Sequence, residues 1–315
     1  MFVMESRYLA VDVGGTSIKY GFFDSKGTLI RKSSIPKTER RVPELIETIG
    51  RLWEMAPERP DGIAVSLNMI VNPQTGEVYG GSNYLMEGDS FPFRERLIER
   101  CGGVPVALDK DSNAALFAEL QTGNLQGAES AIAIILGTGI GLALCINGKI
   151  LYGDNCFAGE ASTMMVGSAC PSDPISAFWY NFSGVPAFVR RTADVIGVDP
   201  ELFSGKDLFA RIEAGDETVI QLFDGFCDTL ATQIMNLTLL LDINRVVIGG
   251  GISAQPLLFE KVRQKLEELN CFLRPSAKAR VPEILPCKYH NDANLYGTFY
   301  RLKAMLDRER REVQG

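Results

Sequence analysis

Short apolar and β-branched runs, punctuated by glycine, open the chain. Within residues 8–35 they predict three successive strands joined by tight turns. Residues 131–153 repeat this pattern, and their Asn147-Gly148 pair is a strong hairpin signal because both positions readily take positive φ. Two copies of one strand pattern, about 120 residues apart, indicate an internal duplication and two similar lobes.

Apolar positions with helical spacing follow each copy. One face of residues 43–57, for example, carries Leu45, Ile49 and Trp53. Further helices are predicted over residues 93–103, 112–124, 216–242, 256–270 and the first part of 292–315, with a helical insert over 176–215 and buried strands over 62–67, 104–109 and 245–251. This alternation predicts an α/β fold, and the charged C-terminal run is expected to be a solvated tail.

The composition supports a folded chain of two domains and narrows its partners. Hydrophobic residues make up 46% and charged residues 23% of the chain, which is typical of globular proteins. A length of 315 residues is sufficient for two domains, each with its own core. A net charge of −7 argues against a nucleic-acid surface. The chain shows neither a secretion signal nor an apolar run near the roughly 18 residues of a membrane helix, so we expect a cytoplasmic protein.

Three glycine clusters follow predicted strands and are candidate phosphate-binding turns. Without bulky side chains, their backbone N–H groups can approach an anion closely. None matches the Walker loop or the GxGxxG spacing, but three clusters at strand ends favour a nucleotide site over isolated turns. The residues predicted to bind the nucleotide are Asp12, Gly14, Gly15, Thr16, Lys19, Gly137, Thr138, Gly139, Gly249, Gly250 and Gly251.

Two aspartates are candidates for chemistry. Asp12 ends an apolar strand beside the first glycine turn, where a carboxylate can hold Mg²⁺ directly or through water; the alternative is a residue that caps a plain hairpin turn. Asp111 lies between a predicted strand and a predicted helix. The helix N-terminus and Lys110 would keep its carboxylate ionised, as a general base requires, whereas the simpler interpretation is an N-cap.

Other polar residues suit ligand binding less distinctly. Glu160 follows a flexible Ala-Gly pair, and Asn83 offers both a donor and an acceptor to a hydroxyl, although each alone is typical of a solvated loop. Seven scattered cysteines form no CxxC pair, and His290 is the only histidine, so we predict neither a disulfide framework nor a zinc site.

The order and spacing of several motifs resemble the ROK family of bacterial sugar kinases and repressors, within the hexokinase-actin-like ATPase superfamily. The motifs are LAVDVGGTSIKYGFFD, VPVALDKDSNAALFAE, LGTGIGLAL, ILYGDNCFAGEAS, and VVIGGG with NDANLYGTFY, and the resemblance covers nearly the whole chain. It implies a duplicated ribonuclease H-like α/β fold with a cleft between two lobes. The expected lobes are residues 1–112, completed by a helix over 296–315, and residues 113–295 with the helical insert.

The resemblance also implies an activity and roles for individual residues. It implies ATP-dependent phosphorylation of a sugar hydroxyl, with Asp111 as general base, ATP and Mg²⁺ as cofactors, and a homodimeric assembly. The first two glycine turns would line the phosphates and the third would approach the nucleoside. The residues expected to contact the sugar are Asn68, Asn83, Lys110, Asp111 and Glu160.

Departures from the family pattern bear on the substrate. Lys110 stands where relatives usually carry Asn, and Asn68-Met69 replaces a usual Pro-Gly. Thr163 occupies the position of a His that, in zinc-bearing relatives, recognises the sugar hydroxyls at C1 and C2. The cysteine-rich zinc motif is missing as well. The layout is similar to zinc-less β-glucoside kinases, with N-acetylmannosamine kinase and glucokinase as alternatives, and the 6-hydroxyl as the expected acceptor. Only seven residues precede Tyr8, which argues against a repressor.

The same residues also fit two other functions. The changes at Lys110 and Asn68 would fit a non-catalytic sugar or nucleotide sensor derived from a kinase, although the intact Asp111 favours catalysis. An ATPase that acts on protein partners, as in actin-like relatives, would turn over ATP without any sugar.

Overall fold

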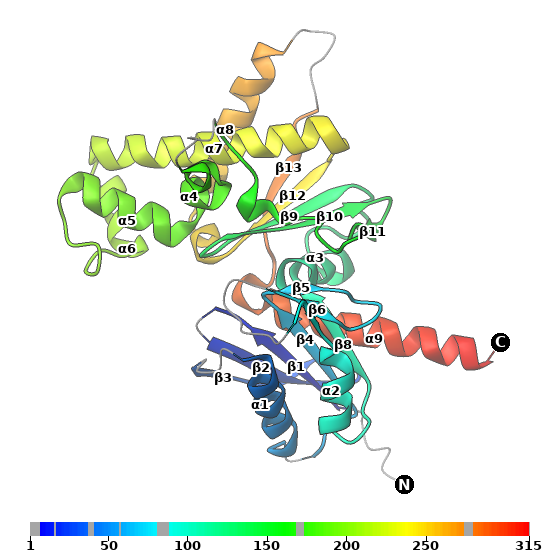
Figure 1. Cartoon of the computed structure of the whole chain (residues 1–315). Helices are drawn as coiled ribbons and strands as arrows, with labels where there is room; N and C mark the ends of the chain where they lie inside the picture. The colour runs from blue at the N-terminus through cyan, green and yellow to red at the C-terminus, as the bar shows by residue number, and fades with distance from the viewer. Residues whose placement is uncertain are drawn as a thin grey trace. The chain divides into compact units, whose positions relative to one another are not determined.

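The chain divides into two units, each built around one five-stranded sheet (Figure 1). The computed structural model describes residues 7–15, 17–36, 41–56, 58–80, 88–167, 173–273 and 280–314, and the statements below concern these residues. The first unit consists of Met1–Gly123, Tyr152–Phe157 and Asp292–Gly315, and the second of Asn124–Leu151 and Ala158–Asn291.

The first unit contains a five-stranded sheet with helices on both faces. Three consecutive strands form an antiparallel meander, and two further strands lie parallel to β1. The strand order is β3-β2-β1-β4-β8. Alternate side chains of β8 face opposite ways: Val106 and Leu108 pack with α1 and α2, whereas Ala107 packs with α9. The elements are β1 (Arg7–Val13), β2 (Ser17–Asp24), β3 (Leu29–Pro36), β4 (Gly62–Leu67), β8 (Val106–Lys110), α1 (Val42–Glu54), α2 (Phe93–Arg100), α3 (Asp111–Thr122) and α9 (Ala293–Gln314).

The second unit repeats this topology. Its sheet has the order β11-β10-β9-β12-β13. Again, a three-stranded antiparallel meander is followed by two strands that lie parallel to the first strand of the unit. In the hairpin turn, Asn147 and Gly148 both have positive φ, as predicted. The elements are β9 (Ala131–Leu136), β10 (Ile140–Ile146), β11 (Lys149–Ile150), β12 (Arg245–Gly249), β13 (Glu283–Pro286), α7 (Glu217–Leu241) and α8 (Pro256–Phe272). The predicted duplicated α/β fold is thereby confirmed.

The helical insert of the second unit packs on α7 through aromatic side chains. It contains α4 (Trp179–Ser183), α5 (Val185–Ile196) and α6 (Gly205–Glu213). Phe188 of α5 and Phe209 of α6 contact Phe223 of α7, with ring centroids 6.4 Å and 5.3 Å away. The insert therefore belongs to the same hydrophobic core as the second sheet.

Two features differ from the sequence-based expectation. A small sheet of β5 (Ile70–Val71), β6 (Val78–Tyr79) and β7 (Ser90–Phe91) and the edge strand β13 were not predicted. The C-terminal charge run is exposed and continues α9, in agreement with the solvated run and the helix over 296–315 that were predicted. Among the helices of the described ranges, none is sufficiently long and apolar to cross a bilayer.

Candidate active site

One edge of the first sheet collects candidate residues from three strands. The parallel registers pair Val13 of β1 with Leu67 of β4, and Leu67 with Lys110 of β8. The next residue after each of these positions is Gly14, Asn68 or Asp111. Since the carboxyl ends of parallel strands share one edge of a sheet, these three positions lie side by side, where open α/β sheets bind ligands. Asn68 is exposed and Asp111 is half-buried.

Asp12 is held at this edge by side chains from three elements. It is only 4% exposed, and its Oδ1 accepts hydrogen bonds from Ser66 Oγ and Asn294 Nδ2, both at 2.9 Å. Lys19 Nζ lies 3.6 Å from Oδ2. The sheet register explains two of these contacts, because Asp12 is paired with Lys19 across β2 and with Ser66 across β4. Sequence reasoning missed Ser66 and Asn294, although Asn294 belongs to the motif NDANLYGTFY.

The first glycine turn is tight at one position and open at the next. Gly14 donates its N–H to Ser17 O at 3.0 Å, and a Cβ at Gly14 would lie 3.2 Å from that oxygen. Gly15 is exposed with open space beside it, so its backbone is accessible to a ligand. Thr16 and Asn83, both predicted to bind ligands, lie outside the described residues.

Asp111 is the first residue of α3, and the N-cap position belongs to Lys110. The N-cap interpretation of Asp111 is thus wrong by one residue. Asp111 Oδ1 accepts a hydrogen bond from the N–H of Ser112 at 2.6 Å. The positive end of the helix dipole favours the ionised carboxylate, and Lys110 beside it is 6% exposed. A partly accessible carboxylate with these neighbours can act as a base.

Asp109 is a second buried carboxylate nearby that sequence reasoning did not single out. It is 1% exposed and accepts hydrogen bonds from Lys110 N (2.8 Å), Asn113 Nδ2 (3.1 Å) and Tyr152 Oη (2.7 Å). Arg301 Nε lies 3.3 Å from its Oδ2. Burial raises the pKa of Asp109, and these donors, Arg301 first, partly offset the effect. The motif VPVALDKD contains this residue, but only the structure reveals its partners.

The second glycine turn, in the second unit, is shaped by a serine. Gly137 and Thr138 are exposed, and Gly137 N–H donates to Gly139 O at 3.1 Å. Ser162 Oγ accepts from the N–H of Ile140 at 2.8 Å and donates to its carbonyl at 3.1 Å. A Cβ on Gly139 would come within 2.7 Å of this hydroxyl. The carbonyl of Gly137 also accepts from the N–H of Val185 at 3.0 Å, so both peptide groups of Gly137 are used within the unit, and Thr138 is the residue of this turn with exposed backbone.

In the third glycine cluster, close packing leaves no space for a side chain at two of the three positions. A Cβ on Gly249 would lie 2.8 Å from Ile135 Cδ1, and one on Gly250 only 2.1 Å from Leu136 O. Gly250 also has φ near +92°. Gly251 is exposed and has open space beside it, so it is the one of the three whose backbone is free to meet a ligand. Because β12 pairs with β9, this cluster and the Gly137–Gly139 turn occupy the same sheet edge.

The predicted sugar contact Glu160 and the only histidine, His290, lie in the second unit. Glu160 is half-buried and immediately precedes the short 3-10 helix Ala161–Thr163. His290 is exposed at the start of another 3-10 turn with φ of 46°. Within the described ranges, no three His, Cys, Asp or Glu side chains gather in a way that could hold a metal ion.

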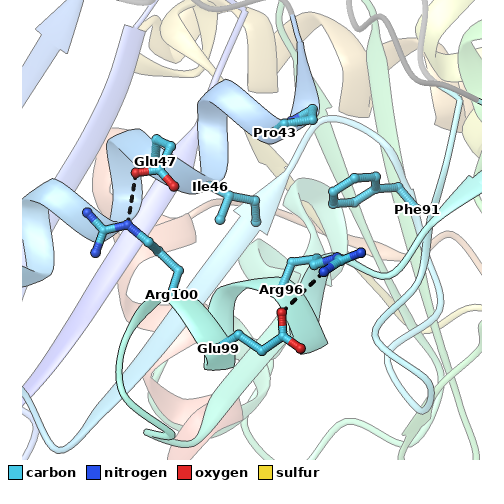
Figure 2. A pocket seen from close by; sticks show the side chains of 7 residues that line it. All are labelled: Pro43, Ile46, Glu47, Phe91, Arg96, Glu99 and Arg100. Carbon is cyan, nitrogen blue, oxygen red and sulfur yellow. Dashed lines mark hydrogen bonds and ion pairs between the residues drawn. The ribbon is translucent and has the colours of Figure 1, made fainter.

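A pocket of about 540 Å³ lies in the first unit between α1, α2 and β7 (Figure 2). Its charged side chains are paired with one another: Arg100 Nε lies 2.9 Å from Glu47 Oε2, and Arg96 Nη1 lies 3.3 Å from Glu99 Oε2. None of the residues predicted to bind nucleotide or sugar lines it. The lining residues are Pro43, Ile46, Glu47, Phe91, Arg96, Glu99 and Arg100.

Comparison with known proteins places these features in a family. Two sheets with the same strand order define the actin-like ATPase class of fold. The sequence profile of the ROK family matches residues 8–304, and the chain belongs to that family.

Several relatives match over most of their length. The chain is 29% identical over 296 residues to a β-glucoside kinase of Listeria monocytogenes, covering 93% of this chain and 96% of the relative. It is also 29% identical to a glucokinase of Halalkalibacterium halodurans, covering 82% and 85%. A ROK family protein of Streptococcus pneumoniae, crystallised with sucrose, superimposes with a TM-score of 0.80 at 26% identity, covering 97% of this chain and 99% of that one.

Proposed function

We propose that this protein is an ATP-dependent sugar kinase in which Asp111 is the general base. The observation that carries the proposal is the register that lines up Gly14, Asn68 and Asp111 at the carboxyl edge of the first sheet. Membership of the ROK family and the kinase names of the relatives support it.

In the proposed reaction, Asp111 accepts the proton of a sugar hydroxyl as that oxygen attacks the terminal phosphorus of ATP. The carboxylate is suited to this role because it is half-buried and stands at a helix N-terminus, which favours its ionised form. Phosphoryl transfer needs little covalent help from the protein, so the main task of these residues is to position the reactants and balance charge.

The glycine turns are proposed to hold the nucleotide. Gly15 and Thr138 offer exposed backbone to phosphate oxygens, and Gly251 is assigned to the nucleoside end. Asp12 would hold Mg²⁺, which would neutralise phosphate charge. Because its Oδ1 already accepts two hydrogen bonds, a contact through a water molecule fits Asp12 better than direct coordination.

The sugar is assigned to the residues around Asp111. Asn68 at the same edge can donate to and accept from a hydroxyl, and Lys110 and Glu160 are proposed as further contacts, with Asn83 from the region not described. A hexose or β-glucoside phosphorylated at its 6-hydroxyl is the substrate we favour, since the chain lacks the zinc motif and is similar to a β-glucoside kinase. A homodimer remains a prediction from the family resemblance.

The decisive experiment couples ADP release to an optical signal across a panel of β-glucosides, glucose, fructose and N-acetylmannosamine. The proposal expects ADP formation that depends on one class of sugar. Asp111→Asn should lower kcat by roughly 10²- to 10⁴-fold while the KM for ATP changes little, because the amide cannot accept the proton. Sugar binding without ADP release would favour a sensor, and equal ATP turnover with and without sugar would favour an ATPase that acts on proteins.

A further inference from the structure

Asp109 stands at a junction of three chain segments in the first unit. Its partners come from α3 (Asn113), from α9 (Arg301) and from the Tyr152–Phe157 segment (Tyr152). The guanidinium of Arg301 also lies 5.5 Å from the ring centroid of Tyr152 and 5.6 Å from that of Phe117 in α3. We call Asp109, Asn113, Tyr152 and Arg301 the Asp109 clamp.

The clamp brackets Asp111 in sequence. Oδ1 of Asp109 binds the N–H of Lys110, directly before Asp111, and the side chain of Asn113, two residues after it. The N-cap residue of α3, Lys110, makes no side-chain capping hydrogen bond. Asp109 therefore ties the N-cap residue to the side chain of Asn113 in the first turn of this helix.

The far side of the carboxylate fixes the helix against the rest of the unit. Oδ2 accepts a hydrogen bond from the phenol of Tyr152 and pairs with the guanidinium of Arg301, so the start of α3 is tied to the Tyr152 segment and to α9. The contact between α3 and α9 is close elsewhere too, since a Cβ on Gly297 would lie 1.8 Å from Ala114 O. A rigid mounting of this kind is what precise placement of a base requires.

Building on the kinase function proposed above, we propose that Asp109 is a positioning residue: through the clamp it fixes the orientation of Asp111 toward the substrate hydroxyl. Asp109 itself contacts neither reactant. Its role predicts a loss in turnover without a loss in nucleotide binding, because the geometry of the base changes while the glycine turns do not.

The test compares steady-state kinetics of Asp109→Asn and Tyr152→Phe with the wild type. An asparagine cannot accept from all four donors, so we expect kcat to fall about 10- to 100-fold with the KM for ATP within about twofold. Tyr152→Phe keeps the ring near Arg301 and loses one hydrogen bond, so kcat should fall about 3- to 10-fold. The double variant should match Asp109→Asn alone, since both changes act through one carboxylate.

Controls separate this role from general destabilisation and from the base itself. Ile49→Val removes one buried methyl group on the other face of the sheet, and it should lower the melting temperature while kcat stays unchanged. If Asp111→Asn is inactive but Asp109→Asn and Tyr152→Phe turn over normally, the positioning role is refuted and the kinase proposal stands. If Asp111→Asn turns over normally, the base assignment fails, and the positioning role fails with it. Should Asp109→Asn not fold, an unchanged kcat in Tyr152→Phe alone overturns the inference.

Discussion

Gly250→Ala is expected to destabilise the second unit strongly, for reasons that can be worked from the backbone. Gly250 has φ near +92° and ψ near 171°, a region that only glycine occupies without strain. An alanine there costs on the order of 1 to 3 kcal/mol in backbone strain. Its Cβ would also lie 2.1 Å from the carbonyl oxygen of Leu136, which belongs to a central strand and cannot move aside cheaply.

The overlap adds to the strain. Overpacking of a well-packed core typically costs about 1 to 3 kcal/mol, so the total loss in unfolding free energy should be roughly 2 to 6 kcal/mol. In a chain of this size, each kcal/mol lowers the melting temperature by about 2 to 4 °C. We therefore expect a fall of at least about 4 °C, measured by circular dichroism or differential scanning calorimetry without nucleotide.

The neighbouring glycine gives a matched control. Gly251 has open space beside it and no positive φ, so Gly251→Ala should leave stability unchanged or raise it by about 0.4 to 1 kcal/mol through a less flexible unfolded chain. Equal melting temperatures for Gly250→Ala and Gly251→Ala would refute the packing explanation. Although Gly251→Ala should not lower the melting temperature, it should raise the KM for ATP above that of the wild type in a kinase assay, because Gly251 is proposed to meet the nucleotide.

Two further outcomes are expected. Burial raises the pKa of the Cys227 thiol to about 12 and that of Cys101 to about 11, so above about pH 9 the folded state retains protons that the unfolded chain loses. The free energy of unfolding should therefore fall as pH rises above about 9. In urea titrations, Cys227→Ala should show a smaller pH-dependent fall in this free energy than the wild type; an equal fall in both would count against this cause. Lys110→Asn, which introduces the residue that the family resemblance implies at this position, should change the KM for the sugar at least threefold and leave the KM for ATP unaltered. Equal sugar KM values would remove Lys110 from the proposed sugar site.

Much of the fold could be predicted from the sequence because its main strands are continuous apolar runs and glycine marks their ends. β1 and β9 are apolar runs of ordinary length, and each is followed by a glycine turn and a second strand. The strands of the small sheet have only two residues each, which is too short for any alternation to register. The charged end of α9 was predicted to be solvated, and it is exposed along a helix that ends close to the predicted position.

The candidate site was predictable only in part. Asp12 and Asp111 stand out because each ends a predicted strand beside a turn or helix start. The partners of Asp12 do not, since Asn294 is 282 positions away along the chain and Ser66 is brought near only by the register of β4. Likewise, nothing in the sequence distinguishes Gly250, which packing requires, from Gly251, which is open to solvent.

The way the chain alternates between its units has a practical consequence. Residues 152–157 and the C-terminal helix both return to the first unit after the chain has left it, so neither unit is a continuous stretch of sequence. Expression of residues 1–123 alone would omit α9 and Tyr152 and leave the apolar sheet face that carries Ala10 and Ala107 uncovered. We expect such fragments to aggregate when made separately and to recover native structure only when the missing segments are supplied together with them.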